Sequence, residues 1–76
     1  MPHLAPIHYS KFHKFLLYVG CEFKRKKGSH MIYSRFDLPR PIVIPERKNI
    51  PVFVIKNNLK LLNISSEKYL RILETL

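Results

Sequence analysis

The chain reads CEFKRKKGSHMIYSR from residue 21 to residue 35. In the first half Phe23 stands among charged residues, and the second half, residues 29–35, is rich in residues that favour β-strands. Between the halves lies Gly28, which can adopt the positive φ that a hairpin turn requires. The stretch therefore predicts two antiparallel strands, over residues 21–26 and 29–35, joined by a tight turn.

A third short strand is predicted after this hairpin. Residues 41–45 read PIVIP, an apolar run between two prolines, which cannot donate hydrogen bonds to a sheet and so bracket the strand. Residues 36–40 contain Asp37 and Pro39 and are typical of a turn. Because short turns link all three strands, we expect an antiparallel meander.

A helix is predicted before the meander, over residues 11–19. Its apolar residues recur at spacing i, i+3, i+4 and i+7 and so share one face: Phe12, Phe15, Leu16 and Val19. Ser10 is the expected N-cap, because its hydroxyl can accept hydrogen bonds from the free amides of the first turn. Gly20 is expected just beyond the C-terminal end. Residues 1–9 contain two prolines and are expected to be an extended lead-in.

The segment after the meander is compatible with either a strand or a helix. Residues 50–55 read IPVFVI, which favours a strand by propensity alone. A helical stripe is nevertheless present, formed by Val52, Ile55, Leu59 and Leu62. Pro51 suits the first helical position, with Asn49 close by as a candidate cap. We therefore predict a helix over residues 51–62, ended by Asn63.

A last short helix is predicted over residues 65–76. Ser65 or Ser66 can cap it, and Glu67 lies at its positive end. Its apolar face is formed by Tyr69, Leu70, Leu73 and Leu76. The sequence leaves open whether this helix packs on the core or serves a partner. The element order predicts an α+β fold, helix–three-stranded antiparallel sheet–helix plus a short C-terminal helix, in a single domain over residues 1–76 with both main helices on one face of the sheet.

The charge of the chain indicates a polyanionic partner. The 76 residues carry a formal net charge of +9, from 14 basic and 5 acidic side chains. The whole excess lies in residues 1–60, because residues 61–76 hold two basic and two acidic side chains. The densest cluster is Lys24–Lys27, at the end of the first predicted strand. A basic patch of this kind supplies affinity for phosphates, so the composition favours nucleic acid.

The composition also bears on the compartment. An apolar content of 46% is high enough for folding and too high for a disordered basic tail. The longest apolar run, Phe15 to Val19, is far shorter than the roughly 18 residues of a membrane span. The N-terminus shows no secretory signal pattern. The single cysteine, Cys21, rules out an internal disulfide framework. We expect a protein of the reducing cytoplasm.

His30 is the candidate catalytic residue. It follows the glycine turn and stands beside four cationic side chains. An imidazole can accept and donate a proton near neutral pH. RNA carries its own nucleophile, the 2′-hydroxyl, so its cleavage requires a proton-transfer group and cations, and no metal or other cofactor. The alternative interpretation of His30 is an ordinary surface histidine.

Other reactive residues give weaker signals. Ser29 and His30 are neighbours on a strand and should point to opposite faces, which discourages a Ser–His dyad. Cys21 is expected to be a small core residue. Tyr33 and Phe36 are able to stack on bases, although aromatic residues of a half-buried sheet usually serve packing. The remaining histidines, His3, His8 and His13, show no spacing typical of metal ligands.

The chain resembles the HicA family of toxins. The resemblance rests on Gly20-Cys-Glu-Phe23, on Lys27-Gly-Ser-His-Met-Ile-Tyr33, and on Ile42-Val-Ile-Pro45, and it covers about residues 5–75. Members are small mRNA interferases of type II toxin–antitoxin systems, with a fold similar to a double-stranded-RNA-binding domain. The resemblance implies that His30 is catalytic, that messenger RNA is cleaved without a metal, and that a HicB-like antitoxin neutralises the protein.

In this hypothesis His30 is the general base for the 2′-hydroxyl or the acid for the leaving oxygen. The RNA phosphate is held beside it by Arg25, Lys26, Lys27, Gly28 and Ser29. One alternative is a non-catalytic RNA-binding module of the same fold, which would bind RNA without cleaving it. Such a module usually grips phosphates with lysines at the start of its second helix, where this chain has Val52-Phe-Val54. Another alternative is a subunit that only binds an acidic protein.

Overall fold

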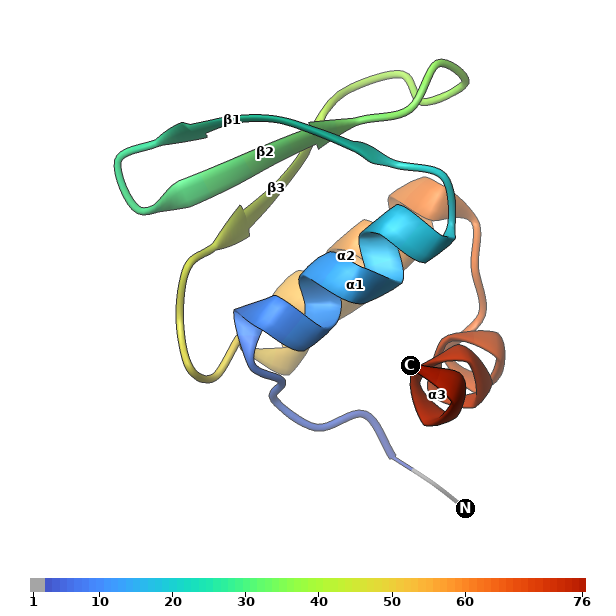
Figure 1. Ribbon diagram of the computed structural model, residues 1–76. Helices are drawn as coiled ribbons and strands as arrows, with labels where there is room; N and C mark the ends of the chain where they lie inside the picture. Colours follow the sequence, from blue (N-terminus) through green and yellow to red (C-terminus); the bar gives the residue numbers. More distant parts are fainter. Residues whose placement is uncertain (1–2) are drawn as a thin grey trace.

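The computed structural model describes residues 3–76, and these form three helices and one three-stranded sheet (Figure 1). Along the chain the elements are α1 (Tyr9–Tyr18), β1 (Glu22–Lys27), β2 (His30–Ser34), β3 (Ile42–Pro45), α2 (Val52–Leu62) and α3 (Ser66–Thr75). The predicted order of elements and the α+β class are confirmed. The first two residues of the predicted lead-in and domain lie outside the described part of the chain.

The sheet is the predicted antiparallel meander, with strand order β1-β2-β3. The central strand β2 pairs on one side with β1 and on the other with β3. The β1–β2 register shifts between Phe23 and Arg25, which leaves Lys24 as the extra residue of a β-bulge. This shift decides which residues of β1 share a face with each residue of β2.

The first helix begins two residues earlier than predicted, and the prediction of Ser10 as its N-cap is wrong. The N-cap is His8, whose Nδ1 accepts a hydrogen bond from the backbone N–H of Ser10 at 3.1 Å. An imidazole nitrogen here satisfies a first-turn amide as a serine hydroxyl would. At the other end Gly20 has φ +91°, as expected, and the N–H of Cys21 bonds to the carbonyl of Leu16 at 2.9 Å.

The ambiguous segment is a helix, as the apolar stripe predicted. Helix α2 follows Pro51, which is its N-cap without a side-chain hydrogen bond, so Asn49 does not act as a cap. Asn63 ends the helix in the left-handed conformation with φ 58°. Ser65 then caps α3 by accepting a hydrogen bond from the backbone N–H of Lys68 at 3.1 Å.

The core lies between the sheet and the helices, and α1 and α2 lie on the same side of the sheet (Figure 1). The sheet contributes Tyr33, Ile42 and Ile44 to it, and all three are fully buried. Helix α3 also packs on this core, which answers the question that the sequence left open. Its Tyr69 ring lies edge-on to Phe15, with ring centroids 4.8 Å apart. Among the described helices, none has the length and apolar character needed to cross a membrane.

Candidate active site

A two-residue turn, Gly28-Ser29, joins β1 to β2 and places His30 at the start of β2. Lys27 and His30 are paired across the turn. Gly28 has φ +60° and Ser29 does not have a positive φ, which is the pattern of a type II′ turn. A Cβ on Gly28 would meet no atom within 4 Å, so the glycine is required by its backbone conformation. The backbone N–H of Glu46 donates to the Ser29 carbonyl at 2.8 Å and fixes the turn to the end of β3.

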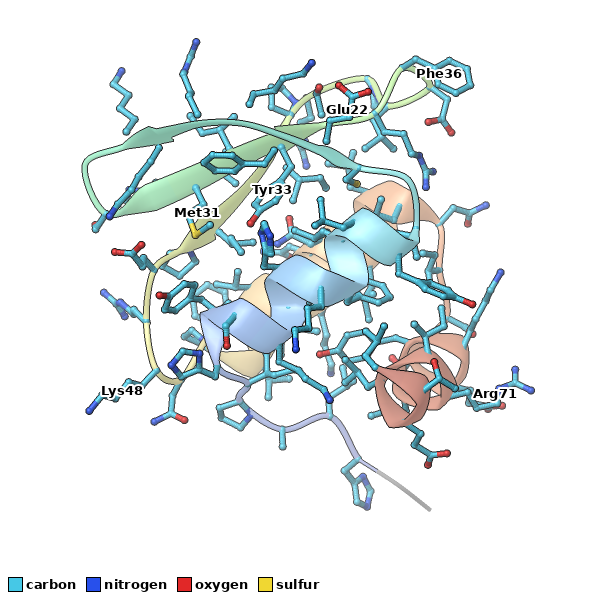
Figure 2. The ribbon with its side chains drawn as sticks, in the orientation of Figure 1. Glu22, Met31, Tyr33, Phe36, Lys48 and Arg71 are labelled. Carbon is cyan, nitrogen blue, oxygen red and sulfur yellow. The ribbon has the colours of Figure 1, made fainter. Side chains whose placement is uncertain are left out.

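The two faces of the sheet have different environments. Tyr33 and Met31 point toward α1, so this is the inner face (Figure 2). Side chains alternate along a strand, and His30, Ile32 and Ser34 therefore lie on the outer face, which none of the three described helices covers. Residues directly opposite each other in an antiparallel pair share a face. Arg25 opposite Ile32, and Lys27 opposite His30, therefore lie on the outer face beside the candidate catalytic histidine.

Lys26 is on the other face from His30. It is opposite Met31, and its Nζ donates a hydrogen bond to Glu46 Oε1 at 2.8 Å. This hydrogen bond and the charge of Glu46 raise the pKa of Lys26. The bulged Lys24 pairs with Glu22 at 2.9 Å. Within the described chain Arg25 and Lys27 have no carboxylate oxygen within 4.0 Å, so they are the two cations of the cluster that are open to an incoming phosphate.

A second histidine, His13, lies beneath the sheet, and its place there was only weakly indicated by the sequence. His13 Nδ1 and Tyr33 Oη share a hydrogen bond of 2.5 Å. Phe23 packs edge-on against both rings, with centroids 6.3 Å from His13 and 5.4 Å from Tyr33. Burial raises the pKa of the Tyr33 hydroxyl to about 12, so it stays protonated at neutral pH. His13 precedes the buried Leu16 by three residues, which was the available signal that it shares the core-facing side of α1.

The remaining reactive groups do not build a second centre. The Cys21 thiol is buried, as predicted, and burial is the main cause that raises its pKa and so suppresses the nucleophilic thiolate. Ser29 and His30 share no side-chain hydrogen bond among residues 3–76. Over the same residues, no three His, Cys, Asp or Glu side chains gather closely enough to hold a metal ion. His30 is thus an exposed candidate for proton transfer that has unpaired cations beside it.

Comparison with known protein families identifies the family of this chain. The family model described as HicA toxin of bacterial toxin–antitoxin matches residues 9–64. The chain belongs to the HicA toxin family. Comparisons with curated proteins and with solved structures found no match.

The HicA family match runs from the first residue of α1 to two residues beyond α2, so it contains the whole sheet and the hairpin of His30. It ends before α3 begins at Ser66. By its family, the chain is accordingly the toxin of a toxin–antitoxin pair. Helix α3 adds Tyr69 and Ile72 to the core of this HicA fold from outside the matched region.

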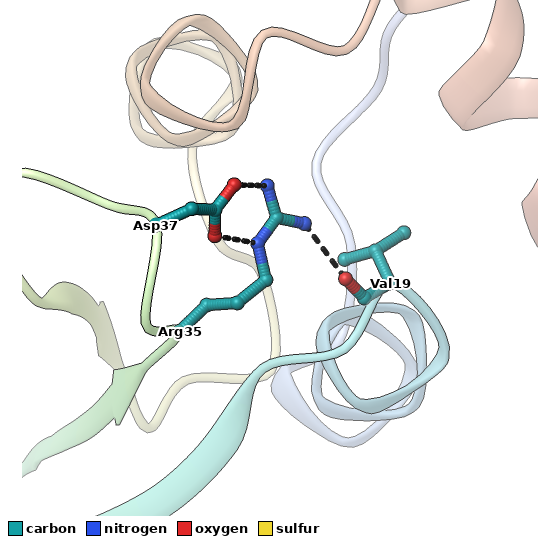
Figure 3. A network of polar contacts seen from close by, with 3 residues as sticks. All are labelled: Val19, Arg35 and Asp37. Carbon is teal, nitrogen blue, oxygen red and sulfur yellow. Dashed lines mark hydrogen bonds and ion pairs between the residues drawn. The ribbon is translucent and has the colours of Figure 1, made fainter.

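The HicA fold also contains a polar network at the opposite end of β2 from His30 (Figure 3). The Arg35 guanidinium donates to both carboxylate oxygens of Asp37, at 2.7 and 3.1 Å, and to the backbone carbonyl of Val19 at 2.7 Å. The hydrogen bond to Asp37 raises the pKa of Arg35 and lowers that of Asp37. The network ties the turn after β2 to the C-terminal end of α1, and sequence analysis did not predict it.

Proposed function

We propose that this HicA-family toxin is an endoribonuclease that cleaves messenger RNA, with His30 as its general acid or base. The observation that carries the proposal is the position of His30: it is exposed on the open face of the sheet, beside β1, which places Arg25 and Lys27 on the same face. Family membership supports the choice of RNA as substrate.

The proposed reaction uses the 2′-hydroxyl of RNA as the nucleophile. A base removes its proton, the 2′-oxygen bonds to phosphorus, and the bond from phosphorus to the 5′-oxygen breaks as that oxygen takes a proton. The products are a 2′,3′-cyclic phosphate and a 5′-hydroxyl. His30 serves as the base in the first transfer or as the acid in the second. The reaction as proposed uses no metal or cofactor.

The cations stabilise the charge that builds on the phosphate oxygens in the transition state. Arg25 and Lys27 do so from the outer face, where their charges are not paired with carboxylates. Lys26, which is paired with Glu46 on the inner face, contributes through the positive field at the edge of the hairpin. Gly28 and Ser29 shape the turn that brings the scissile phosphate to His30.

The test is the His30→Ala variant. Because general acid–base catalysis contributes roughly 10²–10⁴ in rate, cleavage of a messenger RNA in vitro should fall by about that factor. RNA binding should stay nearly unchanged, because the cations remain in place, and growth arrest on expression should be lost. His8→Ala is the matched control, because His8 is another exposed histidine, which caps α1 and lies outside the sheet. Cleavage by His30→Ala at the wild-type rate would refute the assignment, and RNA binding without cleavage by the wild type would indicate a non-catalytic module.

We also propose a HicB-like antitoxin as the partner that neutralises the toxin. To block the reaction it must cover His30 and compensate the positive charge of Arg25 and Lys27, so its contact surface should be acidic. The open outer face of the sheet gives it a surface on which to do both.

A further inference from the structure

Phe36 is fully exposed, in contrast to the other aromatic residue that could stack on RNA bases. Tyr33 is 0% exposed and belongs to the core, whereas Phe36 is 100% exposed. A phenylalanine in this position makes no contribution to the apolar core, although burial of its ring would favour folding. Packing, the usual explanation of an aromatic residue in or beside a sheet, therefore does not explain Phe36.

The backbone that carries Phe36 is held on both sides. The backbone N–H of Leu38 donates to the Arg35 carbonyl at 3.0 Å and closes a turn around Phe36 and Asp37. The side chains of Arg35 and Asp37 are joined to each other and to Val19 of α1 (Figure 3). The Phe36 ring is thus carried by a fixed turn. Binding of a ligand to the ring therefore costs little conformational entropy of the backbone.

Phe36 lies on the same side of the sheet as His30. It projects with Glu22 away from α1, on the side opposite to Tyr33 and Met31 (Figure 2). Phe36 also borders a hollow of about 580 Å³ together with Ser34, which is an outer-face residue of β2. Ser34 is four positions after His30 in β2, which is about 14 Å along a strand. A short single-stranded segment of RNA can therefore reach Phe36 while its scissile phosphate lies at His30.

The surroundings of the ring favour RNA over a protein as its ligand. Most residues that line the hollow with Phe36 are polar or charged. Its two carboxylates are each paired with a cation, Glu22 with Lys24 at 2.9 Å and Asp37 with Arg35 at 2.7 Å, so they do not stand as unpaired charges against a phosphate. A protein anchor normally sits within a dehydrated apolar collar. An isolated exposed ring combined with cations along the same face is the arrangement by which proteins bind single strands, since every base has a face that can stack.

We propose that Phe36 stacks on a base of the substrate RNA and so fixes the position of the strand relative to His30. The inference rests on the proposed function, because it takes RNA as the ligand of the outer face. Phe36 is a positioning residue in this arrangement and takes no part in proton transfer.

The experiment measures RNA affinity by fluorescence anisotropy in a His30→Ala background, so that the RNA stays intact. The probes are a labelled single-stranded RNA of about ten nucleotides and an abasic strand of the same length. Phe36→Ala should weaken binding of the base-containing RNA on the order of 5- to 100-fold, the range seen for base–aromatic stacking, and should leave the abasic strand unaffected. Phe36→Tyr should restore the affinity.

Phe53→Ala is the matched control, because Phe53 is 66% exposed on α2, away from the outer face of the sheet. It should change neither affinity. An unchanged affinity of Phe36→Ala for the base-containing RNA, or an equal loss for both strands, would overturn the proposal. Loss of antitoxin binding with RNA binding retained would overturn it too, by showing that Phe36 is a protein anchor. Because the RNA is not cleaved in this assay, its outcome is independent of the test of His30 as the catalytic group.

Discussion

At the scale of single residues, Lys26 and Lys27 are adjacent and carry the same charge, yet their side chains lie on different faces of the sheet. Lys27 is opposite His30 on the outer face, whereas Lys26 is opposite Met31 and paired with Glu46. A charge beside the scissile phosphate acts on it directly, while a charge that is already paired on the far face acts weakly. The one-residue step along β1 therefore separates a proposed phosphate contact from a residue that ties β1 to the end of β3.

This difference predicts unequal effects of two equal substitutions. Lys27→Ala should weaken binding of single-stranded RNA and lower the slope of log affinity against log salt by roughly one phosphate contact, about 0.7. Lys26→Ala removes the same formal charge and should lower the slope by less than half of that value. Affinity measured over a series of salt concentrations, in the His30→Ala background, gives both slopes. Equal slopes for the two variants would show that the face of the sheet does not matter.

The same alternation explains how far the site could be predicted. The hairpin, its glycine turn and the neighbourhood of His30 follow from local sequence, because a tight turn joins residues that are close in the chain. The separation of Lys26 from His30 follows from the same local register, because the turn pairs Lys27 with His30 and Lys26 with Met31. The contact of Lys26 with Glu46, twenty residues away, and the bulge at Lys24 do not follow from it. Pairing over that distance leaves no local signature, and neither does the hydrogen bond from Arg35 to the Val19 carbonyl, sixteen residues away.

At the scale of elements, the apolar stripe outweighed β-propensity in α2. Ile55, Leu59 and Leu62 are buried together on one face, which a strand of the same residues would have split between two faces. The predicted start of α1 was wrong because histidine is an unusual N-cap. The capping role of His8 depends on which ring nitrogen faces Ser10. In α3 the buried Ile72 was not predicted, whereas Ser65 was one of the two predicted caps.

Two buried tyrosines connect elements in different ways, and the same substitution should affect them differently. Tyr33 joins β2 to α1 through its hydrogen bond with His13, so Tyr33→Phe should lower the free energy of unfolding by about 1 to 2 kcal/mol. Tyr69 packs α3 on α1, but its buried hydroxyl has no hydrogen-bond partner among the described residues. Tyr69→Phe should therefore leave stability within about 0.5 kcal/mol of wild type, or raise it. Urea denaturation of both variants measures the difference, and equal destabilisation would contradict it.

The same tyrosines give the stability a dependence on alkaline pH. Burial raises the pKa of each hydroxyl to about 12, above the value of about 10 in an unfolded chain. The folded state therefore holds these protons more tightly, so their contribution is complete below pH 10 and is lost as the pH rises toward 12. The loss of stability over this range should be smaller in each Tyr→Phe variant than in the wild type.

At the scale of the whole molecule, the positive charge and the HicA family match occupy nearly the same part of the chain. The excess charge belongs to residues 1–60 and the match to residues 9–64, while α3 carries Lys68 and Arg71 against two glutamates. Helix α3 thus completes the core without adding to the positive field. The proposed acidic partner would therefore find the excess positive charge within residues 1–60, and α3 is not required for charge compensation.

Association with the proposed antitoxin should therefore weaken as salt rises. Exposed charges are screened within about 10 Å at 0.1 M salt, so the dissociation constant should increase on the order of tenfold or more between about 50 mM and about 500 mM NaCl. The double variant Arg25→Ala/Lys27→Ala should flatten this dependence, because it removes the two unpaired cations beside His30. Lys68→Ala/Arg71→Ala, which removes the same charge from α3, should leave the salt dependence as it is in the wild type. A dissociation constant that stays the same across the salt series would point to an apolar interface and contradict the acidic partner surface.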